Sequence, residues 1–303
     1  MKISVVIFVA LVLVFSSCNF KSDNNKQTCT ISITDSYQRT VSLKAVPQRI
    51  ISASPAITEI IFAMGEGKRL VGRTLYCKYP AETANIPSIG GLEDPSLETI
   101  VKLNPELVIA STHFKKEMVQ QLETLKIPVI VEKNQDSFDG VYSLINKIAS
   151  ILKVDSKGDS VICGMQKKVE YVKTSCKNIK YQPSVYFVIG FGKTGDFTAG
   201  GNTFISEMIS MAGGINIASD VQGWSYSLEK LIEKDPDIIL IRPGDKALFC
   251  NTTSYQKLKA VKQGKVFEVN NDLFELTGPR LADGLELLFH TIHPEAYNQV
   301  SKN

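Results

Sequence analysis

Ser96-Leu-Glu-Thr-Ile-Val-Lys-Leu-Asn-Pro105-Glu-Leu-Val-Ile-Ala110 occurs a second time in the chain as Ser227-Leu-Glu-Lys-Leu-Ile-Glu-Lys-Asp-Pro236-Asp-Ile-Ile-Leu-Ile241. In both copies a serine precedes a short helical pattern, a proline ends that pattern, and an apolar run typical of a buried strand follows. A second, shorter likeness relates residues 58–65 to residues 206–213, upstream of each copy. Solenoids need several adjacent repeats, so two distant copies predict two similar lobes instead.

Short apolar runs rich in β-branched residues alternate with helical patterns through both halves of the chain. Such alternation predicts α/β units with parallel strands. Between the halves, Val161, Met165, Val169 and Val172 recur at helical spacing, which predicts one long amphipathic helix bridging the lobes. The expected fold is therefore two similar Rossmann-like α/β lobes joined by one long backbone helix, with a ligand cleft between them. The predicted strands are residues 49–53, 107–110, 129–131, 185–189, 238–241 and 266–269.

Length and composition agree with this organisation. The 303 residues are 44% hydrophobic, which is typical of a globular protein and argues against disorder. Single cores stop growing beyond about 250 residues, so this length favours two domains. The 34 basic and 31 acidic side chains leave a net charge of only +3, which disfavours nucleic acid as a partner. The expected boundaries are 41–154 for the N-terminal lobe, 155–181 for the linking helix and 182–303 for the C-terminal lobe.

The N-terminus has the pattern of a secretion signal. Lys2 precedes an apolar run over residues 3–15, and two serines and Cys18 follow. The run is shorter than the roughly 20 residues of a membrane span. Two small residues directly before a cysteine resemble the lipobox of bacterial lipoproteins. Residues 1–17 are therefore expected to be a signal peptide, and residues 18–40 a lipid anchor and tether that holds the protein at the membrane, in the periplasm or at the cell surface. The alternative is a plain signal peptide and a freely diffusing secreted protein.

The remaining cysteines do not form a recognisable framework. Their number is odd, and none has the C-x-x-C spacing of a zinc site, so neither a disulfide scaffold nor a metal site is predicted. Cys163 and Cys176 fall in one helical stretch about 20 Å apart, which excludes a bond between them. The five are Cys29, Cys77, Cys163, Cys176 and Cys250.

Enzymatic alternatives have little support. Gly190-Phe-Gly-Lys-Thr-Gly195 matches the dinucleotide fingerprint G-x-G-x-x-G, but a loop continues to the helix near Thr203, where the motif should open a helix directly. The segment is instead interpreted as a wall of the cleft or as a plain loop. No nucleophile elbow is present. Of the three histidines, His113, His290 and His293, only the last two are close in sequence, and two are too few for a zinc site without acidic partners. No catalytic residue, metal or cofactor is expected; a nicotinamide-type enzyme using the Gly190 loop stays as a less favoured alternative.

Four side chains suggest binding rather than chemistry. Glu98 and Glu229 occupy the same position in the two repeat copies. Each could simply complement a helix dipole, or the two together could form salt bridges with a two-fold symmetric partner. Trp224 is the only tryptophan and stands between glycine and serine, as loop residues do. It is either a core residue or a stacking surface beside a cleft, and Tyr76 could offer a similar surface from the first lobe.

Several segments, in the order in which they follow one another along the chain, resemble the substrate-binding proteins of ABC importers for cobalamin, haem and ferric siderophores. The likeness covers residues 49–293. It is carried by Ile51-Ser-Ala-Ser-Pro-Ala-Ile-Thr-Glu59, Tyr76 with Tyr79-Pro80, Pro95-Ser-Leu-Glu98, Ala212-Gly-Gly-Ile-Asn216, Trp224 with Ser227-Leu-Glu229, and Asn271-Asp-Leu-Phe-Glu275 with Pro279-Arg280.

The resemblance implies a monomeric, non-enzymatic capture protein whose ligand, a metal chelate, is cargo rather than cofactor. It also implies that Glu98 and Glu229 dock into arginine pockets on the two subunits of a membrane permease. A lipoprotein that binds no ligand and serves as a scaffold is the alternative from a different class. The implied ligand-binding residues are Ser54, Pro55, Ala56, Tyr76, Phe197, Trp224, Asp272 and Arg280.

Among these importers, the chain looks most like the cobalamin-binding members. Two positions depart from their pattern: residues 89–91 lack the tryptophan expected there, and Leu276 stands in place of an arginine. A haem or ferric-siderophore receptor is therefore kept as the alternative, using Tyr76, His113 or Arg280. Cys77 could ligate an iron or cobalt centre or be an inert thiol.

Overall fold

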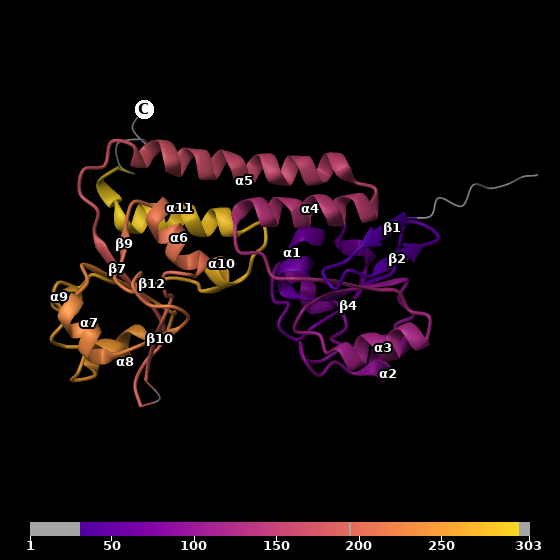
Figure 1. Cartoon of the computed structure of the whole chain (residues 1–303), viewed down its shortest axis with the longest axis horizontal. Coiled ribbons are helices and arrows are strands. Elements are labelled where there is room, and N and C mark those ends of the chain that lie inside the picture. Colours follow the sequence, from indigo (N-terminus) through magenta and orange to yellow (C-terminus); the bar gives the residue numbers. More distant parts are fainter. Residues whose placement is uncertain (1–30, 194, 297–303) are drawn as a thin grey trace, which may run out of the picture.

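A computed structural model describes residues 31–193 and 195–296 of the chain. Two α/β lobes lie side by side, and a long helix runs along one side of both (Figure 1). The predicted fold class is confirmed. The expected signal peptide and Cys18 lie outside the described residues. None of the helices in the described ranges combines the length and apolar composition that crossing a bilayer requires.

The N-terminal lobe is built on a four-stranded parallel sheet in the order β4-β3-β5-β6. Its two central strands, β3 and β5, are buried along their whole length, as expected for a sheet covered on both faces. The strands are β3 (Ile50–Ala53), β4 (Leu70–Arg73), β5 (Leu107–Ser111) and β6 (Val129–Glu132). The helices are α1 (Pro55–Ala63), η1 (Gly67–Arg69), η2 (Ala81–Asn85), α2 (Leu97–Lys102), α3 (Lys116–Thr124) and α4 (Phe138–Leu152).

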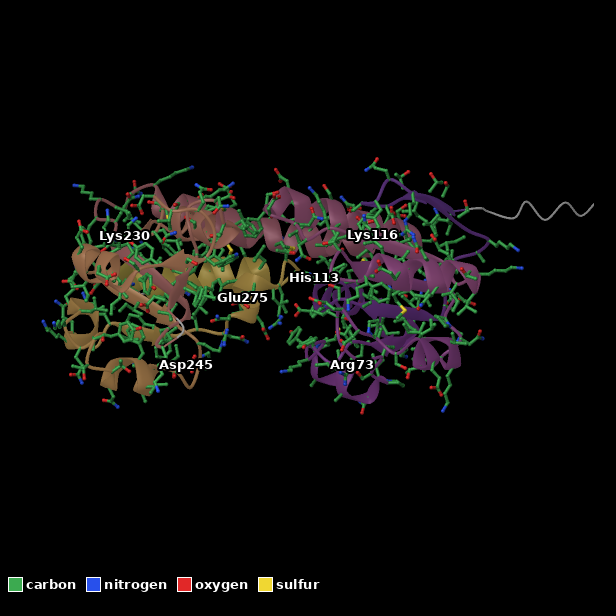
Figure 2. All side chains as sticks on the ribbon, turned by 60° about the horizontal axis from the view of Figure 1, so that its bottom comes forward. Arg73, His113, Lys116, Lys230, Asp245 and Glu275 are labelled. Atoms are coloured by element: carbon green, nitrogen blue, oxygen red, sulfur yellow. The ribbon has the colours of Figure 1, made fainter. Side chains whose placement is uncertain are left out.

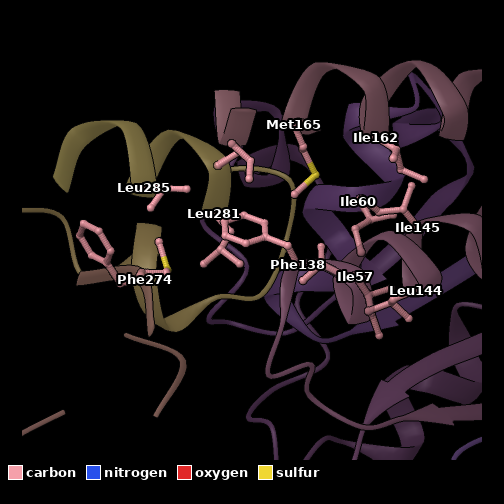
Figure 3. Close-up of a cluster of buried hydrophobic side chains, with 14 of the residues drawn as sticks. Ile57, Ile60, Phe138, Leu144, Ile145, Ile162, Met165, Phe274, Leu281 and Leu285 are labelled. Atoms are coloured by element: carbon pink, nitrogen blue, oxygen red, sulfur yellow. The ribbon is translucent and has the colours of Figure 1, made fainter. Parts of the chain in front are cut away.

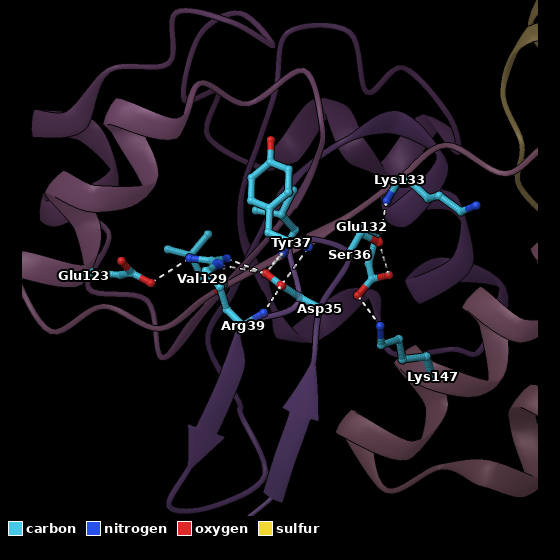
Figure 4. Close-up of polar contacts among 10 residues, drawn as sticks. Asp35, Ser36, Tyr37, Arg39, Glu123, Val129, Glu132, Lys133 and Lys147 are labelled. Atoms are coloured by element: carbon cyan, nitrogen blue, oxygen red, sulfur yellow. Dashed lines mark hydrogen bonds and ion pairs between the residues drawn. The ribbon is translucent and has the colours of Figure 1, made fainter.

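Residues 31–40 were expected to belong to the tether, and this part of the prediction is wrong. They form most of an antiparallel hairpin, β1 (Ile31–Thr34) and β2 (Thr40–Leu43), that is attached to the N-terminal lobe. Asp35 accepts hydrogen bonds from Arg39 and from the backbone N–H of Val131, and Ser36 donates to Glu132 over 3.1 Å (Figure 4). Burial raises the pKa of the Asp35 carboxyl, but the hydrogen bonds from Arg39 and Val131 and the charge of Arg39 together outweigh burial and hold that pKa below its usual value.

The C-terminal lobe has a mixed sheet in the order β10-β8-β7-β11-β12, with β9 also paired to β7. The pairs β7–β11 and β11–β12 are parallel, as predicted, whereas β8 and β10 are antiparallel additions. The strands are β7 (Ser184–Gly190), β8 (Asp196–Thr198), β9 (Ile215–Asn216), β10 (Ser225–Tyr226), β11 (Ile238–Ile241) and β12 (Val266–Glu268). The helices are α6 (Phe204–Met211), α7 (Leu228–Lys234), α8 (Lys246–Asn251), α9 (Lys259–Lys262), α10 (Asp272–Glu275) and α11 (Leu281–Ile292).

The glycine-rich segment after β7 is the connection of a hairpin. Strand β7 turns back into β8, and helix α6 begins only at Phe204. The backbone N–H of Gly192 donates to the hydroxyl of Tyr255, and that hydroxyl donates to Asp196 over 2.6 Å. The segment therefore does not open a helix, as the dinucleotide fingerprint would require.

The linking helix is α5 (Asp155–Cys176), whose 22 residues span about 33 Å. It begins where predicted and ends five residues before the expected boundary at residue 181. The helix packs on α4 of the N-terminal lobe and α11 of the C-terminal lobe. Cys163 and Cys176 both lie on α5 and are free, as are Cys77 and Cys250 among the described residues.

One apolar core runs through the junction of the lobes. Ile162 and Met165 of α5 lie over α1 and α4, and the same cluster continues to Leu281 and Leu285 of α11 (Figure 3). Directly between the lobes, the ring of Phe138 meets that of Phe204 edge to face at 5.3 Å. Because this interface is apolar and closely packed, it favours a fixed relation between the lobes.

Candidate functional site

A pocket of about 550 Å³ lies between the two lobes, and we call it the interlobe pocket. Parallel strands place their carboxyl ends at one edge of a sheet, which is where α/β proteins bind ligands. The pocket is formed there, by the loop after β6 on one side and by residues after β7 and β11 on the other. His113 and Glu275 lie on the two sides of the same boundary between lobes (Figure 2). Its lining includes the side chains of Asn134, Gln135, Asp136, Trp224, Arg242 and Glu275.

Trp224, which the resemblance implies to be a cleft residue, is among the residues lining the interlobe pocket, and its side chain is 48% exposed. Its loop is held from two sides. The carbonyl of Trp224 accepts from the N–H of Thr198, and the N–H of Gly223 donates to Asn202 over 2.7 Å. A Cβ at Gly200 would stand 2.6 Å from the carbonyl of Gly223, so only glycine lets these loops approach. The indole is thus presented by a rigid support.

Arg242 is a pocket residue that the sequence analysis missed. It directly follows β11, at the carboxyl end of the strand, and its side chain is exposed. Across residues 31–193 and 195–296, the guanidinium makes no hydrogen bond or ion pair. Its position directly after a clearly patterned strand was the available signal, because α/β proteins bind ligands at the carboxyl ends of their strands.

Asp136 and Glu275 give the pocket two carboxylates in addition to the arginine. Glu275 lies at the end of α10 and accepts a hydrogen bond from the side-chain amide of Asn271 over 2.9 Å. The pocket therefore offers an aromatic surface, a cation and a set of amide and carboxylate groups. Such a mixture suits a ligand that is partly flat and apolar and partly polar.

The N-terminal lobe residues predicted to bind ligand lie outside the lining of this pocket. Ser54, Pro55 and Ala56 form the buried turn from β3 into α1, where the carbonyl of Ser54 accepts from the hydroxyl of Thr58 over 3.0 Å. Tyr76 lies in the loop after β4 and is 51% exposed, so its phenol is open to a ligand.

The C-terminal lobe residues Phe197 and Asp272 are close to the pocket by position but do not line it. Phe197 is half-buried against Gly190 in the β7–β8 hairpin and pairs with Ser225, the neighbour of Trp224. Asp272 is exposed and begins α10, whose other end supplies Glu275 to the pocket. Both stand next to elements that form the pocket wall.

Arg280 lies in the seam between the lobes. Its Nε and Nη2 donate to the two carboxylate oxygens of Glu59 over 2.9 and 2.5 Å, and its guanidinium stacks on the ring of Tyr79 at 3.8 Å. The Glu59 side chain is only 4% exposed. Burial raises the pKa of Glu59, and the hydrogen bonds from Arg280 oppose this effect. The same hydrogen bonds raise the pKa of Arg280. This bidentate pair connects the two lobes directly.

Glu98 and Glu229 occupy the first turns of α2 and α7, and both are exposed. The two helices begin in the same way, because Ser96 accepts from the N–H of Thr99 and Ser227 from that of Lys230. Both helices lie on the side of their lobes away from α5 (Figure 1). The structure thus brings the two acids to one side of the molecule.

The described residues contain no cluster of three or more His, Cys, Asp or Glu side chains that could hold a metal ion. His113 meets the hydroxyl of Ser111, and His293 meets the carbonyl of Gly213 over 3.1 Å. Cys77 is buried between the hydroxyls of Thr58 and Thr74, away from the interlobe pocket.

A larger hollow of about 670 Å³ lies elsewhere, at the far end of the C-terminal lobe. It is lined by that lobe and by the end of α5, including Tyr181, Asp237 and Phe267. Because it adjoins the amino ends of β11 and β12 and touches only one lobe, it lacks the position expected of a ligand site in this fold.

Two α/β lobes on one helical backbone, with a pocket between their carboxyl edges, are the architecture of a substrate-binding protein of an ABC importer. Comparison with family models agrees, since the periplasmic binding protein model matches residues 50–273. The chain belongs to the periplasmic binding protein family. That family consists of transport proteins that bind small molecules and deliver them to a permease.

The chain aligns with individual relatives along most of its length. It is 28% identical over 285 residues to the ABC transporter substrate-binding lipoprotein YvrC of Bacillus subtilis, covering 92% of this chain and 90% of that one. It is 27% identical to a vitamin B12-binding protein of Pectobacterium carotovorum over 78% of this chain and 85% of the relative. Among solved structures, the haem-binding protein RhuT of Roseiflexus matches with a TM-score of 0.75 and 27% identity over 82% and 99% of the two chains.

Proposed function

We propose that this chain captures a bulky metal chelate, in the first place a corrinoid such as cobalamin, between its lobes and hands it to an ABC permease. The observation that carries this proposal is Trp224, a half-exposed indole on a rigid loop in the interlobe pocket. A flat macrocycle can stack on such a surface. The vitamin B12-binding relative supports the choice of ligand.

A haem or ferric siderophore is the second candidate. Arg242 supports it, because an exposed guanidinium in the pocket is suited to carboxylate or catecholate oxygens. The exposed phenol of Tyr76 and the likeness to the haem-binding RhuT agree with this alternative. The dinucleotide alternative has no such support, because the glycine-rich segment is a hairpin connection.

A titration distinguishes these ligands. The soluble chain, truncated after Cys18, is titrated with cobalamin, haemin and a ferric catecholate while the fluorescence of Trp224, the only tryptophan, is followed. We expect one ligand to quench at sub-micromolar concentration, and calorimetry should give the same affinity. If none of the three binds in either measurement, the metal-chelate proposal is refuted and the ligand-free scaffold becomes the better interpretation.

We propose that Cys18 carries a lipid anchor. The lipobox-like order of two serines and a cysteine supports this, as does the lipoprotein relative from Bacillus subtilis. Cys18→Ala should move the protein from the membrane fraction to the soluble fraction. Continued retention in membranes would contradict the anchor.

We propose that Glu98 and Glu229 dock on the two permease subunits. Their equal positions on two similar helices, on one side of the molecule, support a two-fold partner. The double change to alanine should leave ligand affinity nearly unchanged and reduce uptake in cells. A large loss of ligand affinity would mean that these acids belong to the binding site instead.

A further inference from the structure

The two helices that carry Glu98 and Glu229 share a second feature. Val101 of α2 is 44% exposed and Ile232 of α7 is 38% exposed. Each stands three residues after its glutamate, and the two are equivalent positions of the internal repeat. Residues three apart on a helix are neighbours on its surface, with Cβ atoms about 5–6 Å apart. Each lobe therefore presents an acid beside an aliphatic side chain.

Other residues attach the two helices to their lobes. The adjacent Ile100 and Leu231 are fully buried and attach the two helices to their lobes. β-Branched residues are also poorer helix formers than the charged residues common at exposed positions. A single exposed aliphatic side chain needs no explanation, but the same placement on both copies does.

We propose that the permease-docking surface on each lobe is this acid–aliphatic pair, Glu98 with Val101 and Glu229 with Ile232. The partner is a two-fold symmetric membrane protein that places an apolar hollow beside the cation receiving each glutamate. The inference rests on the proposed docking of the two glutamates and adds the apolar half of the contact. The pairing follows the usual anatomy of protein interfaces, in which apolar groups are buried and charged groups stand near them.

The two halves of the pair have different kinetic effects. Charges at the edge of an interface mainly raise the association rate, and salt weakens that effect. Buried apolar contacts mainly slow dissociation and depend little on salt. The acids and the aliphatic residues can therefore be distinguished in one binding experiment.

The experiment measures binding of the full-length ligand-loaded protein to the cognate permease dimer in lipid nanodiscs, at low and high salt. Val101→Thr and Ile232→Thr keep the branching at Cβ and replace one apolar branch by a hydroxyl. Together they should raise the dissociation rate about tenfold and leave the association rate unchanged. Glu98→Gln with Glu229→Gln should lower the association rate and remove most of its salt dependence.

Ile215→Thr is the matched control. Ile215 is 49% exposed and lies on the same lobe as Ile232, but at the amino end of β7, the edge opposite the pocket. It should bind as the unmodified protein does, and unfolding midpoints should be alike for all variants because every changed side chain is exposed. If the double Thr variant dissociates at the rate of the unmodified protein while the Gln variant is impaired, the acid–aliphatic pair is overturned and the proposed docking of the glutamates stands. No binding by the unmodified protein, or normal binding by the Gln variant, overturns the proposed docking itself.

Discussion

At the scale of single residues, Trp224 is the side chain on which the ligand proposal depends. Trp224→Ala should weaken binding of the ligand identified by titration at least about tenfold, because it removes an aromatic surface that the ligand covers. Calorimetry is the suitable measurement, since the variant has no tryptophan. Leu248→Ala is the control, because Leu248 is 64% exposed and does not line the interlobe pocket. Equal affinities of the Trp224 variant and the unmodified protein would remove the main support for this pocket.

Arg242 tests which part of the ligand faces the C-terminal lobe. Arg242→Met should weaken the binding of cobalamin about tenfold, because the phosphodiester group of cobalamin loses a charge-assisted contact. Cobinamide lacks that phosphodiester and should bind both forms alike. Lys257→Met removes the same charge from an exposed position outside the pocket and serves as control. Equal losses for the two corrinoids would show that Arg242 does not recognise the anionic group.

At the scale of elements, the contact between α4 and α5 depends on a glycine. A Cβ at Gly158 would lie 2.7 Å from the Cβ of Ala149 on α4, so alanine there must push the helices apart. Gly164 lies on the same helix, and a Cβ added there would meet no atom of a neighbouring element within 4 Å. Gly164→Ala should stabilise the protein by about 1 kcal/mol, whereas Gly158→Ala should destabilise it despite the same gain in helix propensity. Thermal unfolding measures the stability of both variants. A higher unfolding temperature for both would contradict the close helix contact.

The N-terminal half of α5 is also attached by charge. Glu66 pairs with Lys157 of α5 over 2.7 Å and with Arg69 over 2.6 Å. The hydrogen bond from Lys157 and the charge of Arg69 hold the pKa of Glu66 below its ordinary value of 4.5, against a smaller opposing effect of burial. A lowered pKa means that the stabilisation is complete above pH 4.5 and is lost as the pH falls through the lower folded-state pKa.

Glu66→Gln should therefore lower the free energy of unfolding by about 1 kcal/mol at neutral pH, a modest value because Lys157 is half-exposed. The difference from the unmodified protein should shrink as the pH falls below 4.5. Urea unfolding across this range measures it, with the exposed Glu233→Gln as control. A difference that stays constant down to acid pH would refute the ion pair as its cause.

At the scale of the whole molecule, the buried pair of Glu59 and Arg280 fixes one lobe against the other. Arg280→Met should cost about 3–5 kcal/mol, because it leaves a buried carboxylate without its partner. The double variant with Glu59→Gln should recover much of this loss. Burial raises the pKa of Glu59, so the deficit of Arg280→Met should be smaller at acid than at alkaline pH, where the carboxylate must ionise. Unfolding of the single and double variants at both pH values tests this, and equal deficits would exclude a buried charge as the cause.

Local patterns along the chain were sufficient to predict the fold class of this protein. The repeat of residues 96–110 in residues 227–241 indicated two lobes, and the spacing of apolar residues along 161–172 indicated the linking helix. Caps, prolines and helical periodicity act over a few residues, so they can be recognised without knowing the fold. The same patterns placed Trp224 on a loop and the two glutamates at equivalent positions.

Which residues meet, in contrast, follows from the tertiary structure. Glu59 and Arg280 are 221 residues apart, and no local pattern relates them. Strands β8 and β10 are three and two residues long, too short to show a periodicity, and the hairpin at residues 31–43 is held by contacts to β6. Arg242 lines the pocket because β11 ends beside the loop that follows β6 in the N-terminal lobe. Long-range packing sets these distances, and it depends on the whole chain, so no single segment is enough to predict them.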